Sequence, residues 1–369
     1  MKILHIASFN GNIGDNASHI GFYKILNRYL ENFNLTKVEI RKFYKNYTLS
    51  DSQVFDEKFV DYINTFDYCF IGGGGFLDYW VKESQTGTTI DIDPNLLFKI
   101  KTNLCFTSIG SNPHKPIPNG NIIKFKNFLE IAQSNKNIKF AFRNDGSIRS
   151  ISRDISNKFS NSFDEILDHG FFYEIDQNYP RIIEKKYVAI NITSDQLEML
   201  SSLRGHIDIK NYHIELSNII NYIINDLNFD IVLIPHIYSD LEAISSLLKS
   251  LNDSIIRSHI SVAPCIQGDN GANYLFSIYD KSEFVIGTRL HSNICSIALG
   301  KYTIGLIALD RLKYLYDFLN ISDRAIILEG NFSVKVVEQI KNYKLNTKLN
   351  YDGLKSKTLK FYDDLFLKV

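Results

Sequence analysis

Short apolar runs alternate with stretches of helical periodicity along most of the chain, and this alternation restricts the fold more than any other feature. The runs at residues 67–71 and 104–109, for example, are almost continuously apolar and end in glycine-containing or polar loops. Apolar residues at helical spacing appear between such runs, as at residues 122–134, and a second strand is expected at residues 38–43. Strands that alternate with helices form parallel sheets whose two faces are covered by helices. The sequence therefore predicts an α/β fold.

The alternation breaks near Tyr179 and Pro180, which lie in a polar stretch, and then restarts. A chain of 369 residues also exceeds the usual size of a single core. We therefore expect two Rossmann-like domains, residues 1–178 and 179–340, followed by a helical tail at 341–369 that packs back on the body. Parallel sheets that face each other across a cleft would give the GT-B-like architecture.

Composition excludes two broad classes of protein. Lysine plus arginine and aspartate plus glutamate both number 41, so the chain lacks the basic excess of a nucleic-acid-binding protein. No apolar run approaches the ~18 residues that a membrane span needs, and the first run is too short for a signal peptide. Four widely spaced cysteines are typical of buried, reduced thiols. We expect a cytoplasmic protein without a nucleic-acid partner, and peripheral association with the inner face of the membrane is compatible with the sequence.

The stretch at residues 282–306 carries the clearest indication of a functional site. A buried strand at 284–286 leads to a turn at Gly287 and then to a helix, with Arg289 and His291 at the junction. Ligands bind outside the carboxyl ends of strands in open α/β sheets, where the N-terminus of the next helix attracts anions. Arginine adds a planar fork for phosphate or carboxylate, and histidine a proton that moves near neutral pH. We expect a site for an anionic substrate here, although a structural ion pair and a capping histidine are the alternative.

Other predicted strand ends also carry candidate residues. Asp15 follows the first strand, either as a base for a substrate hydroxyl or as a helix N-cap. The glycines at 72–75 allow close approach of a ligand to the backbone, or a tight turn alone. His236 ends a strand of the second domain, and Arg143 ends one of the first. We expect Arg143 to face Arg289 across the cleft, so that two arginines hold one anion with more than one charge.

Two metal-site patterns are weak. Asp91 and Asp93 form an Asp-x-Asp motif in a loop, a spacing that is common by chance. His291 and Cys295 lie four residues apart on one helix face, but the neighbours of Cys295 are apolar and favour packing in the core. We therefore predict no metal site.

Four segments carry a resemblance to a known family. They are Gly11-Asn12-Ile13-Gly14-Asp15-Asn16-Ala17, Gly72-Gly73-Gly74-Gly75-Phe76-Leu77-Asp78, Pro235-His236 with Asp240, and Val285-Ile286-Gly287-Thr288-Arg289-Leu290-His291-Ser292. Together they resemble the polysaccharide pyruvyl transferase family, and the arginine–leucine–histidine element is the most specific part. Asp310 with Lys313 fits a further aspartate and lysine of that family, and Arg143-Asn144-Asp145 resembles its arginine–acid element with one residue inserted.

The resemblance implies transfer of pyruvate from phosphoenolpyruvate to a sugar as a cyclic ketal, with release of phosphate and without a cofactor. In this interpretation the first domain is the acceptor side and the second the donor side. His291 protonates the methylene carbon of the donor, and Asp15 assists the attacking hydroxyl. The expected substrate-binding residues are Arg289, Arg143, Ser292, His236, Asn12, Asn16, Gly73, Gly74 and Gly75.

The acceptor is expected to be a hexose of a cell-surface glycan, such as a capsule or exopolysaccharide, or of its lipid-linked precursor. Tyr79 and Trp80 follow the glycine run, and their rings either stack on a sugar or pack in the core. Two alternatives remain open: a GT-B glycosyltransferase that uses a nucleotide sugar, and a non-catalytic glycan-assembly protein with the same fold.

Overall fold

The structure is a computed structural model that describes residues 1–205, 208–344 and 349–367. The chain divides into two compact units, each of which is described by itself. Unit 1 comprises Met1–Phe9, Tyr23–His169 and Asp352–Val369, and unit 2 comprises Asn10–Phe22 and Gly170–Tyr351.

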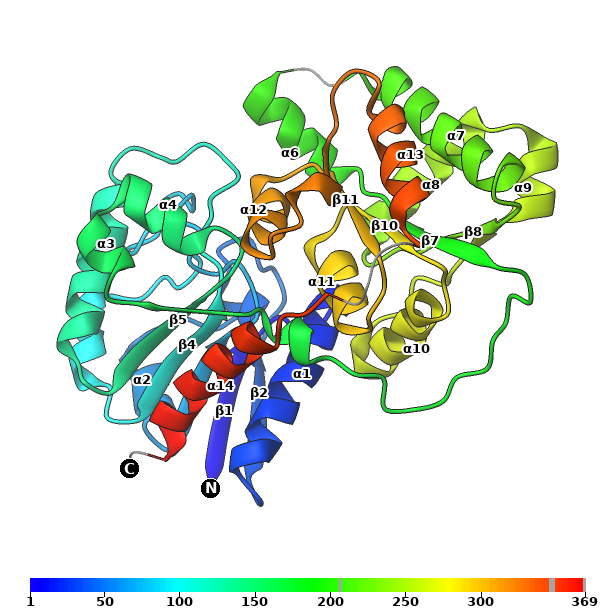
Figure 1. The fold of residues 1–369 in the computed structure, drawn as a ribbon. Helices are drawn as coiled ribbons and strands as arrows, with labels where there is room; N and C mark the ends of the chain where they lie inside the picture. The colour runs from blue at the N-terminus through cyan, green and yellow to red at the C-terminus, as the bar shows by residue number, and fades with distance from the viewer. Residues whose placement is uncertain (206–207, 345–348, 368–369) are drawn as a thin grey trace. The chain divides into compact units, whose positions relative to one another are not determined.

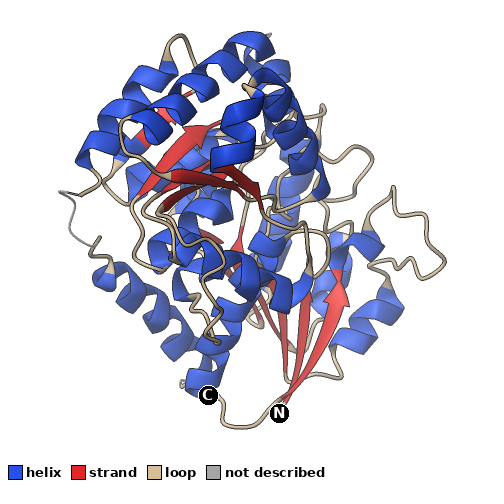
Figure 2. Cartoon of the chain, turned by 90° about the vertical axis from the view of Figure 1, so that its right-hand side faces the viewer, coloured by secondary structure: helices blue, strands red, loops and turns tan. Residues whose placement is uncertain are grey.

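A six-stranded sheet forms the centre of unit 1, with the strands in the order β2-β1-β3-β4-β5-β6. Figure 1 labels β2, β1, β4 and β5 of this sheet. All of its neighbouring strands pair in parallel. Helices cover the sheet (Figure 2), so the central strands are buried on both faces, which explains their continuous apolar runs. The strands are β1 (Lys2–Ala7), β2 (Asn34–Glu39), β3 (Tyr68–Gly72), β4 (Asn103–Ile109), β5 (Ile138–Arg143) and β6 (Asp164–Ile166).

Unit 2 contains a second six-stranded parallel sheet, in the order β12-β11-β10-β7-β8-β9. β10 and β7 are central in this order, which places the strand before Arg289 next to the first strand of the unit. The strands are β7 (Tyr187–Asn191), β8 (Asp230–Leu233), β9 (Ile260–Val262), β10 (Val285–Gly287), β11 (Thr303–Ile307) and β12 (Ala325–Ile327). Two parallel sheets among helices confirm the predicted α/β class.

The helices of the two units lie between these strands and after the last of them. Those of unit 1 are η1 (Ile40–Phe43), α2 (Glu57–Ile63), η2 (Pro94–Lys99), α3 (Asn121–Ser134), α4 (Ser147–Asp154), α5 (Asn157–Ser160) and α14 (Asp352–Phe366). Those of unit 2 are α6 (Asp195–Arg204), α7 (Ile209–Asn225), α8 (Tyr238–Ser250), α9 (Asp253–His259), α10 (Gly268–Asp280), α11 (Leu290–Ala298), α12 (Asp310–Phe318), η4 (Ser322–Arg324) and α13 (Phe332–Asn342). Two elements have residues in both units, α1 (Ile13–Tyr29) and η3 (His169–Phe172).

The first turns of α1 belong to the core of unit 2. Ile13 and Ala17 are fully buried in an apolar cluster that also contains Val285 of β10 and Phe276 of α10. These turns therefore pack with the second sheet, although they lie within the predicted N-terminal domain. The unit boundary between His169 and Gly170 also falls before the predicted boundary at 178/179.

The predicted C-terminal tail contributes to unit 1 through α14. Tyr362 hydrogen-bonds Thr107 of β4 and His169, and the ring of Phe366 packs at a tilt against Tyr68 of β3 with centroids 5.1 Å apart. Residues 345–348 and 368–369 of that tail lie outside the described residues.

The second strand differs from its expected position at residues 38–43. The strand spans Asn34–Glu39, and the residues after it form the 3₁₀ helix η1. The Glu39 carboxylate accepts hydrogen bonds from the backbone N–H groups of Arg41 and Phe9, at 3.1 and 2.8 Å. This cap turns the chain into a helix, and apolar residues at 40 and 43 face the core at helical rather than strand spacing.

Candidate active site

The carboxyl ends of three neighbouring strands in unit 2 hold the residues predicted around position 289. β10, β7 and β8 lie side by side, so the residues that follow them meet at one sheet edge. Asn191, the last residue of β7, connects these ends. Its Oδ1 accepts from the backbone N–H of Arg289 at 3.0 Å, and its Nδ2 donates to the carbonyl of Ile234 at 3.0 Å. Side-chain hydrogen bonds therefore fix the edge where the strands separate.

Arg289 is buried, and its guanidinium is held by two carboxylates. Nε donates to both oxygens of Asp240 at 2.9 Å, while Nη2 donates to Asp240 at 2.6 Å and to Asp195 at 2.7 Å. Nη2 also reaches Thr193 Oγ1 at 2.9 Å. Burial alone lowers the pKa of Arg289, but its hydrogen bonds and the charges of Asp240 and Asp195 raise that pKa above its ordinary value. Arg289 is therefore a fixed, permanently charged group.

The planar fork of Arg289 is thus occupied by the protein's own acids. Both Nε and Nη2 are engaged, and within the described part of the chain Nη1 makes no hydrogen bond. A guanidinium that is engaged in this way can offer one nitrogen to a ligand rather than a bidentate contact. The prediction that Arg289 binds an anion stays a prediction, and the structure limits it to a single contact.

His291 faces Asp15 across the first turns of two helices. Nδ1 of His291 lies 3.6 Å from Oδ1 of Asp15, and the two side chains are only 7% and 14% exposed. His291 is in the first turn of α11 and Asp15 in the first turn of α1. Helix N-termini present unpaired N–H groups and a partial positive charge. An acid–base pair therefore lies where two helix ends favour negative charge.

Gly14 allows this close approach of α1 to α11. A Cβ atom added to Gly14 would lie 2.6 Å from Cβ and 2.9 Å from Nδ1 of His291. Those separations are far below van der Waals contact, so any other residue would displace the imidazole. The glycine is required here by packing, and the sequence offered no independent signal for it.

Asn12 caps α1, whereas Asp15 was the residue that the sequence offered as an N-cap. The Oδ1 atom of Asn12 accepts from the backbone N–H of Gly14 at 3.0 Å. The Asp15 carboxylate is thereby left to face His291. Asn16 donates from Nδ2 to Asp269 at 3.0 Å. The two predicted substrate-binding amides thus both make hydrogen bonds within unit 2.

His236, which follows β8, is fully buried and hydrogen-bonded to protein groups. Its Nε2 lies 2.8 Å from the Tyr279 hydroxyl, and its backbone N–H donates to Asp240 at 2.8 Å. Burial holds the pKa of His236 well below its ordinary value, and the charges of Arg289 and His291 lower it further. His236 is therefore neutral. Its carbonyl accepts the backbone N–H of residue 13 at 3.4 Å, which anchors the start of α1.

Ser292 has a structural partner. Its hydroxyl is fully buried and donates to the carbonyl of Arg289 at 2.7 Å, beside a 2.8 Å hydrogen bond from Asn293 to the same carbonyl. A Cβ on Gly287 would lie 2.4 Å from the Ser292 hydroxyl. Gly287 therefore lets β10 turn tightly into α11.

The glycine run of unit 1 follows β3 and is tied to the end of β4. Gly73 has a left-handed backbone with φ of 77° and donates to the Thr107 carbonyl at 3.3 Å. A Cβ on Gly74 would lie 2.5 Å from the Phe76 ring, and one on Gly75 would lie 2.9 Å from Asp78. Backbone conformation at Gly73 and packing at Gly74 and Gly75 therefore account for glycine without any ligand, and ligand contact at Gly73, Gly74 and Gly75 stays a prediction.

Arg143 ends β5 in unit 1 and has an environment similar to that of Arg289. Its Nε donates to Asp145 at 2.5 Å, and its Nη1 lies 3.6 Å from Asp168. Burial opposes the charge, but Asp145 and Asp168 raise the pKa of Arg143 above its ordinary value. Arg143 and Arg289 belong to different units, so the expectation that they hold one anion stays a prediction.

Asp195 was missed by sequence reasoning, although it helps to hold Arg289. It opens α6 directly after β7 and accepts from Thr193 and Arg289. The cluster Thr193-Ser194-Asp195 at a strand end has the same kind of polar signal as the residues that were singled out. Burial tends to raise the pKa of Asp195, but Arg289 and Thr193 lower it below its ordinary value.

The two metal patterns have other roles. Asp91 accepts from the backbone N–H of Gln85 at 2.7 Å, and Asp93 caps η2 through the N–H of Asn95 at 3.0 Å. Cys295 is buried in the apolar core of unit 2. Among residues 1–205, 208–344 and 349–367, no three His, Cys, Asp or Glu side chains are grouped as a metal site.

The family model described as polysaccharide pyruvyl transferase matches residues 12–310. That span is most of the chain and includes both Asp15 and His291. The chain belongs to the polysaccharide pyruvyl transferase family. The resemblance drawn from its motifs is thereby confirmed, and the family makes a transferase the class of enzyme. No curated protein matches the chain in sequence.

Solved structures with a similar fold include two UDP-GlcNAc 2-epimerases and a structure of S. aureus MnaA with UDP. That of Methanocaldococcus jannaschii has a TM-score of 0.59 at 10% identity, with 100% of both chains covered. That of Rickettsia bellii has a TM-score of 0.56 at 12% identity and covers 100% of this chain and 96% of its own. The S. aureus MnaA–UDP structure has a TM-score of 0.54 at 10% identity, with 97% and 90% covered. At such identities the likeness shows the fold alone, and it supports the predicted GT-B-like class.

No helix in the described residues is long and apolar enough to cross a membrane.

Proposed function

We propose that the protein transfers pyruvate from phosphoenolpyruvate to a sugar, forming a cyclic ketal and releasing phosphate. The observation that carries the proposal is the Asp15–His291 pair, which lies at two helix N-termini within the segment that the family model matches. The pair offers a proton donor and an acceptor, and the N-terminus of α11 offers N–H groups to an anionic donor substrate.

The first step needs an acid. His291, protonated at the start, gives its proton to the methylene carbon of phosphoenolpyruvate, and C2 becomes electrophilic. Asp15, 3.6 Å away, supplies the counter-charge of the imidazolium and fixes the orientation of the ring. The backbone of Gly14 prevents the ring from moving toward α1.

The second step forms the ketal. One sugar hydroxyl adds to C2 and loses its proton to the Asp15–His291 pair. A second hydroxyl then displaces phosphate from C2. The two sugar hydroxyls release two protons in total. One restores the proton that His291 gave to the new methyl group, and the other leaves with phosphate. Protonation alone activates C2, so the proposal includes no cofactor.

Donor binding follows from the same geometry. The N-terminal N–H groups of α11 and Nη1 of Arg289 are the groups we assign to the phosphate and carboxylate. Arg143 is retained as a second candidate on unit 1. The acceptor we propose is a hexose of a cell-surface glycan or its lipid-linked precursor, used on the cytoplasmic side of the membrane.

Thermal unfolding in the presence of phosphoenolpyruvate tests the donor. A ligand that binds the native state at 100 times its Kd adds about 2.7 kcal/mol of stability, which raises Tm measurably. We expect this rise in the wild type and a smaller one in Asp15→Asn and His291→Asn. Release of phosphate from phosphoenolpyruvate with a glycan acceptor should fall by at least about a hundredfold in His291→Asn.

A matched control is present in the same unit. His259 Nδ1 lies 2.9 Å from Asp230 at the amino end of β8, away from the sheet edge that holds Asp15 and His291. His259→Asn removes a histidine–aspartate pair without touching the proposed site, so its response should equal that of the wild type. Stabilisation by a nucleotide sugar and not by phosphoenolpyruvate would instead indicate a glycosyltransferase. Stabilisation by neither would indicate a non-catalytic protein.

A further inference from the structure

A pocket of about 680 Å³ opens at the carboxyl edge of the sheet in unit 1. This volume falls in the range of about 300–1,000 Å³ that is usual for small-molecule sites. Its walls come from the segments after β2, β3 and β4, which is the edge where α/β sheets bind ligands. Neither Asp15 nor His291 lines this pocket.

The walls combine aromatic rings with positive charge. Trp80 is half-buried in the wall, beside Phe43 and Tyr44. The lysines Lys45, Lys82 and Lys115 also line the pocket, against a single acid, Asp91. An aromatic face suits the C–H face of a sugar ring, and an excess of ammonium groups suits a phosphate.

Trp80 and Lys115 are held together. The Lys115 Nζ atom lies 4.3 Å from the centroid of the indole ring, a cation–π contact. His114 meets the same ring edge-on with centroids 5.9 Å apart. The ring is therefore positioned before any ligand arrives, and a charge is fixed next to it.

Hydroxyl groups of the loop that follows Trp80 form hydrogen bonds within the loop itself. Thr86 Oγ1 donates to the carbonyl of residue 90 at 2.7 Å and lies 2.9 Å from Thr88 Oγ1. Asn121 Nδ2 reaches the carbonyls of Tyr79 and Val81 at 3.1 and 2.9 Å. A loop without regular structure that buries such a network is preorganised for binding.

Tyr79 and Trp80 thus divide the two roles that the sequence left open. Tyr79 is fully buried, stacks on Phe125 with centroids 5.1 Å apart and donates to Asp154. It belongs to the core of unit 1. Trp80 is the ring that faces a cavity.

We infer that this pocket binds the glycosyl phosphate end of the acceptor, with the sugar on Trp80 and the phosphate among Lys82, Lys115 and Lys45. The assignment to the acceptor rests on the proposed function, whereas the binding of a sugar phosphate rests on the pocket alone. The positive charges favour an acceptor that still carries its phosphate over a neutral glycan. Lys45 contributes least, because its Nζ already donates to the carbonyl of residue 83 at 2.5 Å.

The chain contains one tryptophan, so the emission of Trp80 reports on this pocket without a label. Galactose 1-phosphate, galactose and inorganic phosphate are titrated separately against the full-length protein. We expect a saturable change in emission with galactose 1-phosphate, at a midpoint at least about tenfold below those of the other two. Equal midpoints for galactose 1-phosphate and inorganic phosphate would overturn the sugar site, and so would an unchanged emission with all three.

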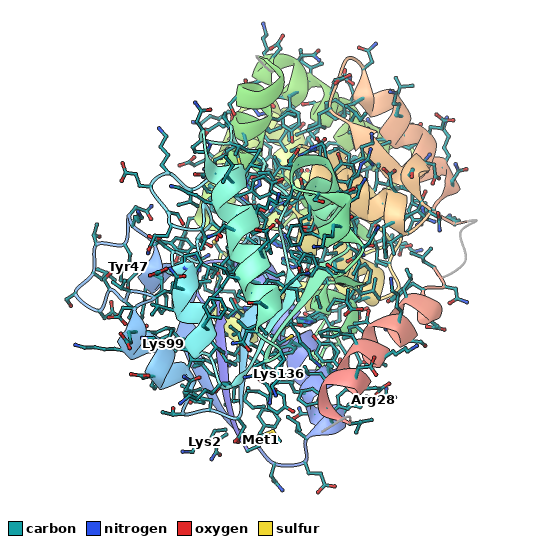
Figure 3. The ribbon with its side chains drawn as sticks, turned by 90° about the vertical axis from the view of Figure 1, so that its left-hand side faces the viewer. Met1, Lys2, Arg28, Tyr47, Lys99 and Lys136 are labelled. Carbon is teal, nitrogen blue, oxygen red and sulfur yellow. The ribbon has the colours of Figure 1, made fainter. Side chains whose placement is uncertain are left out.

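The variant Lys82→Gln/Lys115→Gln tests the charges. Its midpoint for galactose 1-phosphate should rise by about tenfold or more, while the response of Tm to phosphoenolpyruvate is retained. Lys136→Gln is the control, because Lys136 (labelled in Figure 3) is an exposed lysine of the same unit outside the pocket. A double variant that binds galactose 1-phosphate like the wild type would overturn the inference. Binding of galactose 1-phosphate without any response to phosphoenolpyruvate would overturn the proposed function and leave the pocket assignment standing.

Discussion

Gly14 lies directly against His291, so close that a Cβ atom at position 14 would come within 2.6 Å of the histidine's own Cβ. Gly14→Ala should therefore displace the imidazole from Asp15. Because a misplacement of about 1 Å costs on the order of a hundredfold in rate, we expect kcat for pyruvyl transfer to fall by that order. Gly353→Ala, at a helical glycine with nothing within 4 Å of an added Cβ, is the matched control. Equal kcat values for the two variants would contradict the packing argument.

Arg289 should contribute to the stability of the fold, whether or not it binds a substrate. Arg289→Ala leaves Asp240, which is fully buried, and Asp195 without their partner. Breaking a buried ion pair by removal of one partner costs about 3–5 kcal/mol. We expect that loss in urea unfolding, whereas Arg289→Lys keeps the charge and should lose less. An Arg289→Ala variant with the same urea midpoint as the wild type would show that the ion pairs of Arg289 with Asp240 and Asp195 do not stabilise the sheet edge.

His236 should make the protein less stable in mild acid. Its pKa is well below the ordinary value because of burial, and the charges of Arg289 and His291 add to the effect. The ring of His236 contacts the Tyr279 hydroxyl, whereas Asp240 accepts a hydrogen bond from the backbone N–H of His236. The unfolded chain therefore binds a proton that the native state does not, and stability is lost as pH falls below about 6.5.

The slope of this loss is about 1.4 kcal/mol per pH unit for one such group. His236→Gln removes the titrating group, so its free energy of unfolding should depend less on pH between neutrality and mild acid. The comparison is made against His259→Asn, since His259 is partly exposed and paired with Asp230. A steeper pH dependence in His236→Gln than in the wild type would show that His236 is protonated in the native state.

Asn12 should stabilise the protein through its N-cap hydrogen bond at the start of α1. Asn12→Ala removes the acceptor of the Gly14 N–H and should cost about 1 kcal/mol of stability. Asn12→Asp keeps an acceptor and should retain most of it. Because Asp15 lies in the same first turn, kcat should fall in Asn12→Ala and recover in Asn12→Asp. A loss of donor binding with unchanged stability would instead assign Asn12 to the substrate.

The fold could be predicted because its signal is local. A strand buried on both faces requires a continuous apolar run, and the runs before residues 72 and 287 predicted β3 and β10 correctly. The second strand was misplaced because Val38 and Ile40 alternate as in a strand, whereas Ile40 and Phe43 have helical spacing, and the cap by Glu39 decided for a helix. The candidate residues could be found for the same reason, because the residues that follow a predicted strand can be read directly from the sequence.

The sequence by itself determined the two parallel sheets and placed Arg289 and His291 at the edge of one of them. The tertiary structure alone decided what those side chains face. Asp15 meets His291, and Asp240 and Asp195 take up the guanidinium fork, because strand order and helix packing bring distant segments together. No periodicity in the chain records such a contact. It depends on the packing of α1 on α11, which requires the absence of a side chain at Gly14.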